Sequence, residues 1–441
     1  MNIIRGYNAG LEVLGKDRLN NWAEPSKAIM SSIHLNFGHD FDLPKAITKI
    51  ITDVREQGDS GVNKYTELFD KVLPPTFEVP KEECLNAYRH TPKRIRKALE
   101  VISDRVTDFH KKSLPQSWID YQQGFGELFT PISKVGIYVP GGTASYPSTV
   151  LMTAIPAKVA GVGEVILCSP SRGGRPDQLV LAAAYMTGVD KVFQIGGAQA
   201  IAAMAYGTES VPRVDLISGP GNLFVTTAKQ LVYGDVAIDG LYGPTETVII
   251  ADHEADPNQC AADLIAQGEH DPMACPVFLT TSEELWDKVS TRIDTQLKTL
   301  PRKEIAMTAL NTRGTTVIVD NLDEAIDLAN TFAPEHLCLL VKNPWDLVRN
   351  IKHAGGVFIG PQSPEVMGDY VAGPSHVMPT SGTARFNSPL GVHHFLKVSS
   401  LVGLDESLFE KLAPHAMLIA QQEGLVGHRK AMALRKKGNR G

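Results

Sequence analysis

The sequence predicts an α/β protein with two doubly wound, incompletely Rossmann-like parallel sheets and small helical segments at the N- and C-terminal ends. Two observations carry this prediction. Between residues 134 and 245, four short apolar runs alternate with helical stretches, the runs being "KVGIYV", "EVILCSP", "KVFQIGG" and "VDLISGPG". Past residue 245 the same pattern returns in "TETVIIADH" and "PVFLTTS". Short, nearly continuous apolar strands separated by helices are typical of parallel sheets covered on both faces.

The segments on either side of these runs are predicted to be helical. In the first 130 residues, stretches such as "LPKAITKIITDVREQ" carry apolar residues at spacings of three and four, which is the helical period. Asp42 and the pair Thr91-Pro92 precede two of these stretches and are good helix starts. The tail from about residue 390 is also expected to be helical, most clearly in "ESLFEKLAPHAMLIAQQ".

Composition and charge argue against several classes of protein. The 441 residues are 43% hydrophobic, and a net charge of −6 with a pI near 6.1 gives no reason to expect nucleic-acid binding. We expect no signal peptide and no membrane span, because no window reaches the roughly 18 consecutive apolar residues that a span needs. Five cysteines without a CxxC pair indicate a reducing compartment, so a cytoplasmic protein is expected.

Three glycine-containing loops follow the predicted strands of the first sheet: "PGGTASYPS", "IGGAQ" and "SGPGN". In parallel sheets ligands bind beyond the carboxyl ends of the strands, so these loops are the candidate binding region. The chain has no GxGxxG fingerprint. Backbone N–H groups in such loops can still bind a pyrophosphate, but the glycines also serve simply to turn the chain. Both interpretations remain open on the loops alone.

The stretch "AQGEHDP" is a candidate metal site. Gln267 and His270 are three residues apart near a predicted helix end, so both side chains can face one point. Imidazole is a common ligand for divalent metals, and an amide oxygen is a poorer one. Asp369 and His428, which both follow glycine-containing turns, are candidates to complete the set. The alternative is that His270 is an ordinary surface or core histidine.

The stretch "FAPEHL" has a different setting. Proline restricts Ala333 to an extended conformation and is a good first helical residue, so Glu335 and His336 are predicted to open a helix. At a helix N-terminus the dipole keeps His336 neutral and favours Glu335 as a carboxylate. Neighbouring helical side chains point about 100° apart, so the pair can perform two successive tasks. An acidic residue in a first helical turn is, however, also routine.

Taken together, the motifs resemble the histidinol dehydrogenase family from about "GVNKYTELFD" to "EGLVGH". The similar blocks are long and occur in order: "VGIYVPGGTASYPSTVLMTAIPAKVAGV", "GGAQAIAAMAYGTESVPRVDLISGPGN", "GPTETVIIAD", "AQGEHD", "APEHL" and "GDYVAGPSHVMPT". The resemblance implies a zinc-dependent enzyme that performs the last two steps of histidine biosynthesis. L-Histidinol would be oxidised through L-histidinal to L-histidine, with two NAD consumed.

The resemblance also implies roles for individual residues. The catalytic pair would be Glu335 and His336. The zinc ligands, which also bind the substrate, would be Gln267, His270, Asp369 and His428. Further substrate contacts would come from Thr245, His336, His376 and Glu423, and NAD contacts from Tyr138, Gln199 and Asn222. The family is a homodimer with shared active sites, so Glu423 and His428 would act in the site of the partner subunit.

With these roles, the chain is expected to divide into four parts. A helical segment occupies residues 1–29. A zinc-binding and catalytic α/β domain combines residues 30–137 with 245–389, and an NAD-binding α/β domain occupies 138–244. A helical dimerisation segment forms the end of the chain, over residues 390–441.

A few positions depart from the family pattern. Ser375 stands where Asn is usual, Tyr242 where Ala is usual, Thr245 where Ser is frequent, and Thr143 where Lys is frequent. The segment "SPLGVHHFLK" is also unusual. These departures leave the implied catalytic residues and zinc ligands intact. They bear on the identity of the small amino alcohol that serves as substrate.

Four rival functions are compatible with the sequence. A paralogue of the same fold would oxidise another primary alcohol, such as sulfopropanediol. An aldehyde dehydrogenase-like enzyme would use Cys168 as nucleophile, although no basic residue lies near it in sequence. A zinc hydrolase would use Glu335 as its base. A non-catalytic binding protein would leave the polar residues of these motifs without a purpose.

Overall fold

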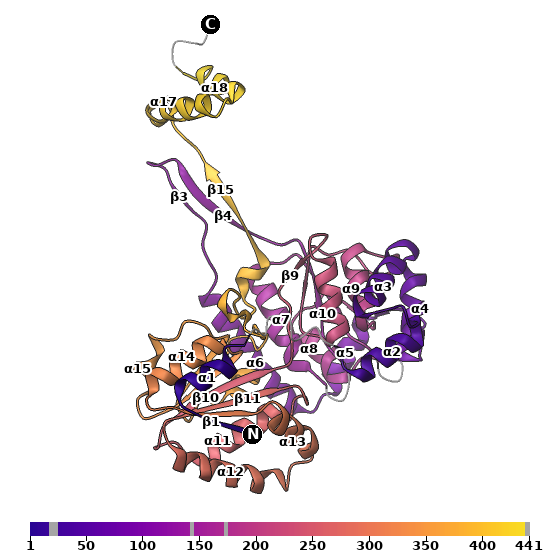
Figure 1. Cartoon of the computed structure of the whole chain (residues 1–441). Coiled ribbons are helices and arrows are strands. Elements are labelled where there is room, and N and C mark those ends of the chain that lie inside the picture. The colour runs from indigo at the N-terminus through magenta and orange to yellow at the C-terminus, as the bar shows by residue number, and fades with distance from the viewer. Residues whose placement is uncertain (17–24, 142–144, 172–174, 437–441) are drawn as a thin grey trace. The chain divides into compact units, whose positions relative to one another are not determined.

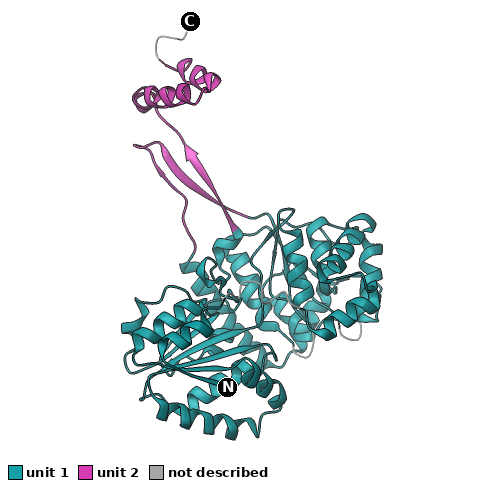
Figure 2. Ribbon diagram, in the orientation of Figure 1, with its two compact units in different colours: residues 1–113, 132–395 teal, residues 114–131, 396–441 magenta. Residues whose placement is uncertain are grey.

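The computed structural model describes residues 1–16, 25–141, 145–171 and 175–436 (Figure 1). It forms two compact units (Figure 2). The first comprises residues 1–113 and 132–395, and the second comprises residues 114–131 and 396–441. Among the described residues, no helix is both long and apolar enough to cross a membrane. All five cysteines are free thiols.

The first unit contains a six-stranded sheet built from the first set of predicted apolar runs. Its order is β2-β7-β6-β5-β8-β9, and all neighbouring strands are parallel except β2, which pairs antiparallel with β7. The strands are β2 (Glu78–Val79), β5 (Lys134–Tyr138), β6 (Glu164–Cys168), β7 (Lys191–Phe193), β8 (Leu216–Ser218) and β9 (Ala237–Ile238). Strands β5 and β6 are buried along nearly their whole length, as their continuous apolar runs predict.

Helices cover both faces of this sheet. They are α2 (Lys27–Phe37), α3 (Leu43–Gln57), α4 (Asp59–Asp70), α5 (Lys81–His90), α6 (Lys93–Lys112), α7 (Pro147–Ala160), α8 (Gln178–Met186), α9 (Gly197–Tyr206) and α10 (Leu223–Val232). The predicted helix start at Asp42 is confirmed, because its carboxylate accepts a hydrogen bond from the Lys45 N–H at 2.9 Å. One hydrophobic core joins α3, α4, α9 and α10 to the strands.

A second six-stranded sheet, also in the first unit, is parallel throughout, as predicted. Its order is β1-β12-β11-β10-β13-β14. The strands are β1 (Asn2–Arg5), β10 (Glu246–Ala251), β11 (Cys275–Thr280), β12 (Thr315–Ile318), β13 (His336–Leu340) and β14 (Gly356–Ile359). Apart from the edge strands β2 and β1, the remaining five strands of each sheet follow the same order, β7-β6-β5-β8-β9 and β12-β11-β10-β13-β14. Both sheets are doubly wound.

Two separate hydrophobic cores cover the faces of the second sheet (Figure 1). One contains α1 (Tyr7–Leu14), α14 (Leu322–Phe332) and α15 (Pro344–Val348). The other contains α11 (Pro257–Gly268), α12 (Glu283–Leu297) and α13 (Lys303–Thr312). The short helix α16 (Glu365–Tyr370) follows β14 and packs near α11.

The prediction that a helix begins at "FAPEHL" is wrong. Helix α14 ends at Phe332, and Ala333 closes it in the left-handed conformation with φ of 53°, so Ala333 is not extended. His336 is then the first residue of β13, a strand that is buried throughout between β10 and β14. Pairing on both edges and burial of an apolar run outweigh the local helical signal of Pro and Glu. The helix-dipole argument for a neutral His336 therefore does not apply.

The expected grouping of the N-terminal residues also differs from the structure. Residues 1–29, expected to be helical, begin with strand β1, which completes the second sheet. Within 30–137, helices α3 and α4 share the core of the first sheet, not that of 245–389. The reason is that their apolar faces pack against α9 and α10, which sequence periodicity cannot identify as partners.

The second unit contains a three-stranded antiparallel sheet and two helices. The strands are β3 (Trp118–Asp120), β4 (Phe125–Pro131) and β15 (Leu396–Val402), in the order β15-β4-β3. The helices are α17 (Glu406–Gln422) and α18 (Val426–Ala433). The tail expected to be helical from residue 390 therefore includes a strand, whose partner β4 lies more than 250 residues earlier in the chain.

Candidate active site

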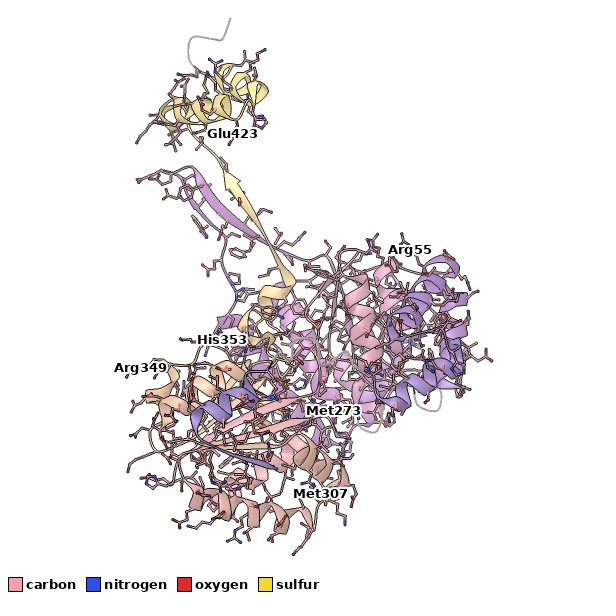
Figure 3. The ribbon with its side chains drawn as sticks, viewed as in Figure 1. Arg55, Met273, Met307, Arg349, His353 and Glu423 are labelled. Carbon is pink, nitrogen blue, oxygen red and sulfur yellow. The ribbon has the colours of Figure 1, made fainter. Side chains whose placement is uncertain are left out.

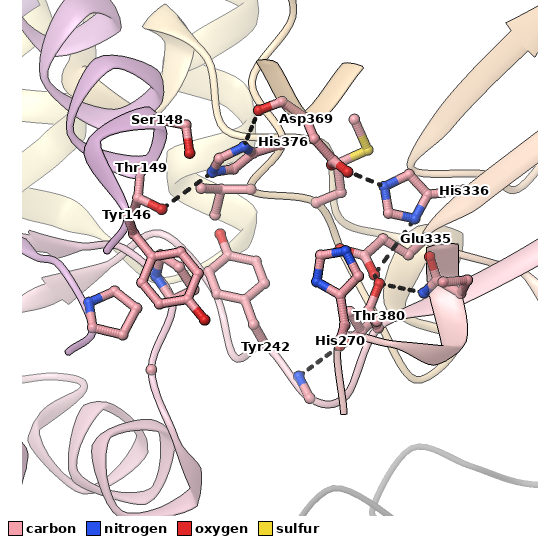
Figure 4. Close-up of a pocket in the computed structure, with 18 of the residues that line it drawn as sticks. Tyr146, Ser148, Thr149, Tyr242, His270, Glu335, His336, Asp369, His376 and Thr380 are labelled. Carbon is pink, nitrogen blue, oxygen red and sulfur yellow. Dashed lines mark hydrogen bonds and ion pairs between the residues drawn. The ribbon is translucent and has the colours of Figure 1, made fainter. Parts of the chain in front are cut away.

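A cavity of about 270 Å³ lies where loops of the first sheet meet the amino ends of strands in the second (Figure 4). The residues lining it include Tyr146, Thr149, Pro220, Tyr242, Thr245, Gln267, His270, Glu335, His336, Asp369, His376 and Thr380. The structure therefore brings together all the predicted catalytic, metal-binding and substrate-binding residues that belong to the first unit.

Glu335 is a buried carboxyl group at the start of β13, with 7% of its surface exposed. Its Oε2 accepts hydrogen bonds from Thr245 Oγ1 at 2.6 Å and from the Glu246 N–H at 3.1 Å. Burial raises the pKa of Glu335 well above its usual value, and the two hydrogen bonds oppose that shift. A carboxylate in this setting is a stronger base than an exposed one, which suits proton transfer.

The ring of His336 lies beside this carboxyl group, with Nδ1 3.7 Å from Glu335 Oε2. The same Nδ1 lies 3.2 Å from the Glu246 carbonyl oxygen, so in a neutral ring Nδ1 carries the proton and donates it to that carbonyl. Nε2 then keeps its lone pair. It is buried without a hydrogen-bond partner among the described residues, 4.0 Å from Asp369 Oδ1 (Figure 4). His336 therefore presents an unprotonated nitrogen to the cavity.

Gln267 sits at the end of α11, where a network of buried groups orients its carboxamide. The favoured orientation directs the nitrogen to Thr247 Oγ1 at 3.0 Å and to Glu365 Oε1 at 2.9 Å. The oxygen then lies 2.6 Å from Thr245 Oγ1 and 3.1 Å from the Glu246 nitrogen, so it shares these two donors with Glu335, and the single Thr245 hydroxyl proton bonds one of the two acceptors at a time. Glu365 is itself buried, which raises its pKa to about 7. It thus fixes which atom of Gln267 faces the cavity.

Asp369, on α16, connects two histidines of the site. Its backbone carbonyl accepts a hydrogen bond from His376 Nδ1 at 2.8 Å, so Nε2 of a neutral His376 is the acceptor, 3.3 Å from Thr149 Oγ1 (Figure 4). Burial lowers the pKa of His376, with the Asp369 carboxylate opposing the shift. His270 also lines the cavity. The site therefore combines imidazole side chains with carboxyl groups.

The donor chemistry of this cavity fits a divalent cation. The carboxylate of Asp369, the imidazole of His270 and the amide of Gln267 all line it. The described residues hold no cluster of three or more His, Cys, Asp or Glu side chains placed to bind a metal, and here one of the three donors is an amide. His428 and Glu423, the other predicted contributors, are exposed residues of the second unit. Glu423 is labelled in Figure 3.

A second cavity, of about 400 Å³, lies at the carboxyl ends of the first sheet. Tyr138 ends β5, Gln199 lies on α9 and Asn222 caps α10, and all three line this cavity. The Tyr138 hydroxyl accepts a hydrogen bond from the Gly197 N–H at 3.0 Å, and the Gln199 amide oxygen is buried without a partner in the part of the chain that the structure describes. Strands β5 and β8 flank the point where strand order reverses, which is the usual ligand position in doubly wound sheets. The loop "PGGTASYPS", with Thr143, lies partly outside the described residues.

A buried ion pair supports the turn between the two cavities. Lys229 Nζ lies 2.5 Å from Asp239 Oδ1 and donates to the Gly219 carbonyl at 2.9 Å, while Asp239 accepts from the Gly219 N–H at 2.7 Å. Gly219 has φ of 115°, and a Cβ there would lie 2.2 Å from the Tyr138 carbonyl oxygen, so only glycine fits. The ring of Tyr242 covers the Lys229 ammonium group at 4.9 Å.

Sequence reasoning did not identify three groups of the two cavity regions, Glu365, Lys229 and Asp70. Of these, Asp70 lines the second cavity. Each stands in a stretch whose periodicity indicates an ordinary helix or turn, so no local signal could have identified it. Cys168, the candidate nucleophile of one rival function, is fully buried, and burial raises the pKa of its thiol. It is therefore a packing residue and not a thiolate nucleophile.

Comparison with known proteins gives consistent results. The family model described as histidinol dehydrogenase matches residues 38–436. The histidinol dehydrogenase of Dehalococcoides mccartyi is 48% identical over 435 residues, which cover 98% of this chain and 99% of that protein. The histidinol dehydrogenase of Prochlorococcus marinus is 46% identical over 395 residues, or 89% of this chain and 90% of that protein.

A solved structure is also similar along the whole chain. The crystal structure of histidinol dehydrogenase from Elizabethkingia anophelis superimposes with a TM-score of 0.91 at 32% sequence identity. The match covers 99% of this chain and 98% of that one.

Proposed function

We propose, from the premise that the chain belongs to the histidinol dehydrogenase family, that it oxidises L-histidinol to L-histidine through L-histidinal. Membership makes the chain an enzyme of the dehydrogenase class. The finer proposal is a zinc-dependent, four-electron oxidation that reduces two NAD and completes histidine biosynthesis. One observation carries it: Glu335 and the unprotonated Nε2 of His336 face the same cavity, next to a second cavity at the switch point of the other sheet.

In the first half-reaction, His336 acts as the base. The Glu246 carbonyl holds the proton of the ring on Nδ1, so Nε2 is free to take the hydroxyl proton of the substrate. Burial of the ring, which is 4% exposed, excludes competing water. When NAD is bound, it accepts a hydride from the substrate carbon in each half-reaction.

In the second half-reaction, Glu335 takes a proton from the water that adds to the aldehyde. Its buried position makes the ionised carboxylate strongly basic, and Thr245 holds Oε2 in place at 2.6 Å. His336 then serves again as base for the hydrated aldehyde. Because the two side chains leave the chain at adjacent positions, one cavity supplies both bases without a rearrangement.

Gln267, His270 and Asp369 are the residues of this cavity that would hold zinc, and His428 would be supplied by the other subunit of the proposed dimer. When bound, the metal would polarise and orient the substrate through its amine and imidazole nitrogens. The Glu365 and Thr247 contacts to Gln267 support this role, because they direct the amide nitrogen away from the cavity. Thr245, His376 and Glu423 would complete the substrate site.

We assign the coenzyme to the first sheet and catalysis to the second. This keeps residues 138–244 as the NAD-binding part and places zinc and substrate on the part around 245–389. Residues 390–441 are proposed to dimerise, with Glu423 and His428 acting in the site of the partner subunit. The five free thiols fit a reducing compartment such as the cytoplasm.

An assay of NADH formation tests the proposal. L-Histidinol should yield two NADH per molecule, and chelator treatment should abolish turnover until zinc is added back. Other primary alcohols should be assayed in parallel, because the large ring of Tyr242 lines the cavity and can alter which alcohol the cavity accepts. Faster turnover of another alcohol would favour the paralogue function. Full activity in metal-free protein would contradict the metal assignment.

Mixed dimers test whether the sites are shared. A subunit carrying His428→Ala and one carrying Glu335→Gln are each expected to be inactive alone. Mixed together, they should regain activity if one site takes its catalytic pair from one subunit and His428 from the other. Activity no higher than that of either parent would contradict shared sites.

A further inference from the structure

Asp70 lies in the coenzyme cavity but has no role in the reaction as proposed above. It is the last residue of α4, and it lines the second cavity together with Tyr138, Gln199 and Asn222. Its Oδ2 is buried and has no hydrogen-bond partner among the described residues. The side chain is therefore an acceptor directed into a binding cavity, with nothing in the described chain to satisfy it.

The position of Asp70 is unfavourable for the stability of the fold. A negative charge at the C-terminal end of a helix faces the negative end of the helix dipole. A buried carboxylate oxygen without a partner loses its hydration, and burial accordingly raises the pKa of Asp70. A neutral residue would be more stable here. A residue that costs stability inside a ligand cavity is best explained by a contact with the ligand.

The arrangement of the two cavities shows which part of a dinucleotide lies near Asp70. They are adjacent at two points, where Pro140 and Gly221 line the first cavity and their chain neighbours Gly141 and Asn222 line the second. The reacting nicotinamide must be at this junction. Asp70 belongs instead to the wall that α2, α3 and α4 contribute, which lines the second cavity alone.

The neighbours of Asp70 on this wall suit an adenosine. Ile50 and Phe69 provide apolar and aromatic surface on which an adenine ring can pack. A carboxylate beside such a surface is the group that binds the vicinal hydroxyls of an adenine ribose in many dinucleotide sites, by two charge-assisted O–H···O⁻ hydrogen bonds. A phosphate on the ribose 2′ oxygen would instead bring about two negative charges against the carboxylate.

We infer that Asp70 binds the adenine-ribose hydroxyls of the coenzyme and makes the enzyme select NAD over NADP, an inference that rests on the proposed use of NAD. Asp70 is a specificity-determining residue in this assignment. It takes no part in proton transfer, which belongs to Glu335 and His336 in the other cavity.

Steady-state kinetics with both coenzymes test the assignment. In Asp70→Asn and Asp70→Ala, the KM for NAD should rise roughly 10- to 100-fold, the range expected for a charged hydrogen bond, with kcat largely kept. The preference for NAD over NADP should fall by a similar factor. Glu67→Gln is the matched control, because Glu67 is exposed on the same helix and its change removes the same charge. It should leave both values as they are in the wild type.

Two further measurements separate this role from a structural one. The melting temperature of Asp70→Asn should equal or exceed that of the wild type, whereas a structural aspartate would lower it. Direct titration with ADP-ribose and its 2′-deoxy analogue should show that loss of the 2′-hydroxyl weakens binding to the wild type about tenfold and leaves Asp70→Ala unchanged. Equal losses in both proteins, or a lowered melting temperature with an unchanged KM for NAD, would overturn the assignment.

The titration also distinguishes a failure of the Asp70 assignment from a failure of the proposed function. ADP-ribose carries the adenine ribose without the nicotinamide, so its binding does not depend on turnover. Wild-type protein that binds ADP-ribose through Asp70 but forms no NADH from L-histidinol would contradict the proposed function and keep the Asp70 assignment. Turnover of NAD with no dependence on Asp70 would do the reverse.

Discussion

Five strands of each six-stranded sheet follow the same order, but the two sheets place their candidate site residues at opposite edges. In the first sheet, Tyr138 and the turn from Gly219 to Asn222 follow the carboxyl ends of β5 and β8. In the second sheet, Thr245 and the pair Glu335-His336 stand at the amino ends of β10 and β13. Identical topology therefore does not decide which edge of a sheet becomes a site.

The chemistry of the two edges explains the difference. The first edge is made largely of turns and small residues, where backbone groups can approach a ligand. In the second sheet, the corresponding carboxyl edge is closed by Asp252, which accepts hydrogen bonds from the Lys342 N–H at 2.9 Å and the Glu254 N–H at 3.0 Å. The Lys342 and Glu254 N–H groups at this edge are therefore already occupied. The second sheet uses side chains of its other edge instead.

The largest expected effect tests this division of labour. Glu335→Gln and His336→Asn should each lower kcat for acid formation by about 10²- to 10⁴-fold, because each removes a base, while the KM for NAD stays near the wild-type value. Gln199→Ala, on the other edge, should raise the KM for NAD and retain more of kcat. Initial rates at varied NAD check both. A KM for NAD that rises equally in all three variants would contradict separate roles for the two edges.

The next effect concerns the turn that supports the first edge. Lys229→Met should cost about 3–5 kcal/mol of unfolding free energy, because it leaves Asp239 charged and buried without its partner. Adding Asp239→Asn should restore part of that loss. Lys134→Met is the control, since its ion pair with Glu164 is partly exposed to solvent and is worth about 0–1 kcal/mol. Urea unfolding measures all three, and equal losses for the two lysines would show that the buried pair does not hold the turn.

We expect stability to depend on pH through His110, which lies near the start of β14 in the second sheet. His110 is fully buried, neither ring nitrogen has a partner among the described residues, and burial lowers its pKa to about 4. The folded pKa is below the unfolded value of about 6.5, so the native state is penalised as pH falls from 6.5 to 4. Up to about 3 kcal/mol should be lost across this window.

The measurement is the unfolding free energy at pH 7.5 and pH 4.5. His110→Leu should lose less stability between these values than the wild type does, because leucine cannot bind the proton. His90→Gln, at an exposed histidine, should follow the wild type. A wild type and a His110→Leu variant with the same pH dependence would contradict a buried neutral ring.

The smallest expected effect concerns the carboxyl edge of the second sheet, which has no proposed role in binding. Asp252→Asn should cost about 1 kcal/mol, because it weakens the backbone hydrogen bonds that the carboxylate accepts. Both kcat and the KM for NAD should be unchanged, since this edge of the second sheet has no part in binding. A large loss of activity without a loss of stability would show that this edge is functional after all.

Much of this architecture follows from the sequence. Apolar runs of four to seven residues between helical stretches predict buried parallel strands, and both sheets confirm that expectation. The loops after β5, β7 and β8 were identified as binding loops because carboxyl ends of parallel strands share an edge, and they line the second cavity. The similarity of ordered motifs indicated the family, which the comparisons show. These predictions rest on local patterns, or on motifs that follow one another in a set order along the chain.

Other features were decided only by the tertiary structure. Pro334 and Glu335 favour a helix start locally, yet His336 begins a central strand because pairing with β10 and β14 outweighs that preference. The basic nitrogen of His336 is set by the Glu246 carbonyl, which is 90 residues away in the chain. Asp70 becomes notable only because folding buries its Oδ2 with no hydrogen-bond partner among the residues that the structure describes. Periodicity reports which face of an element is buried, but not which distant group it meets, and protonation depends on that group.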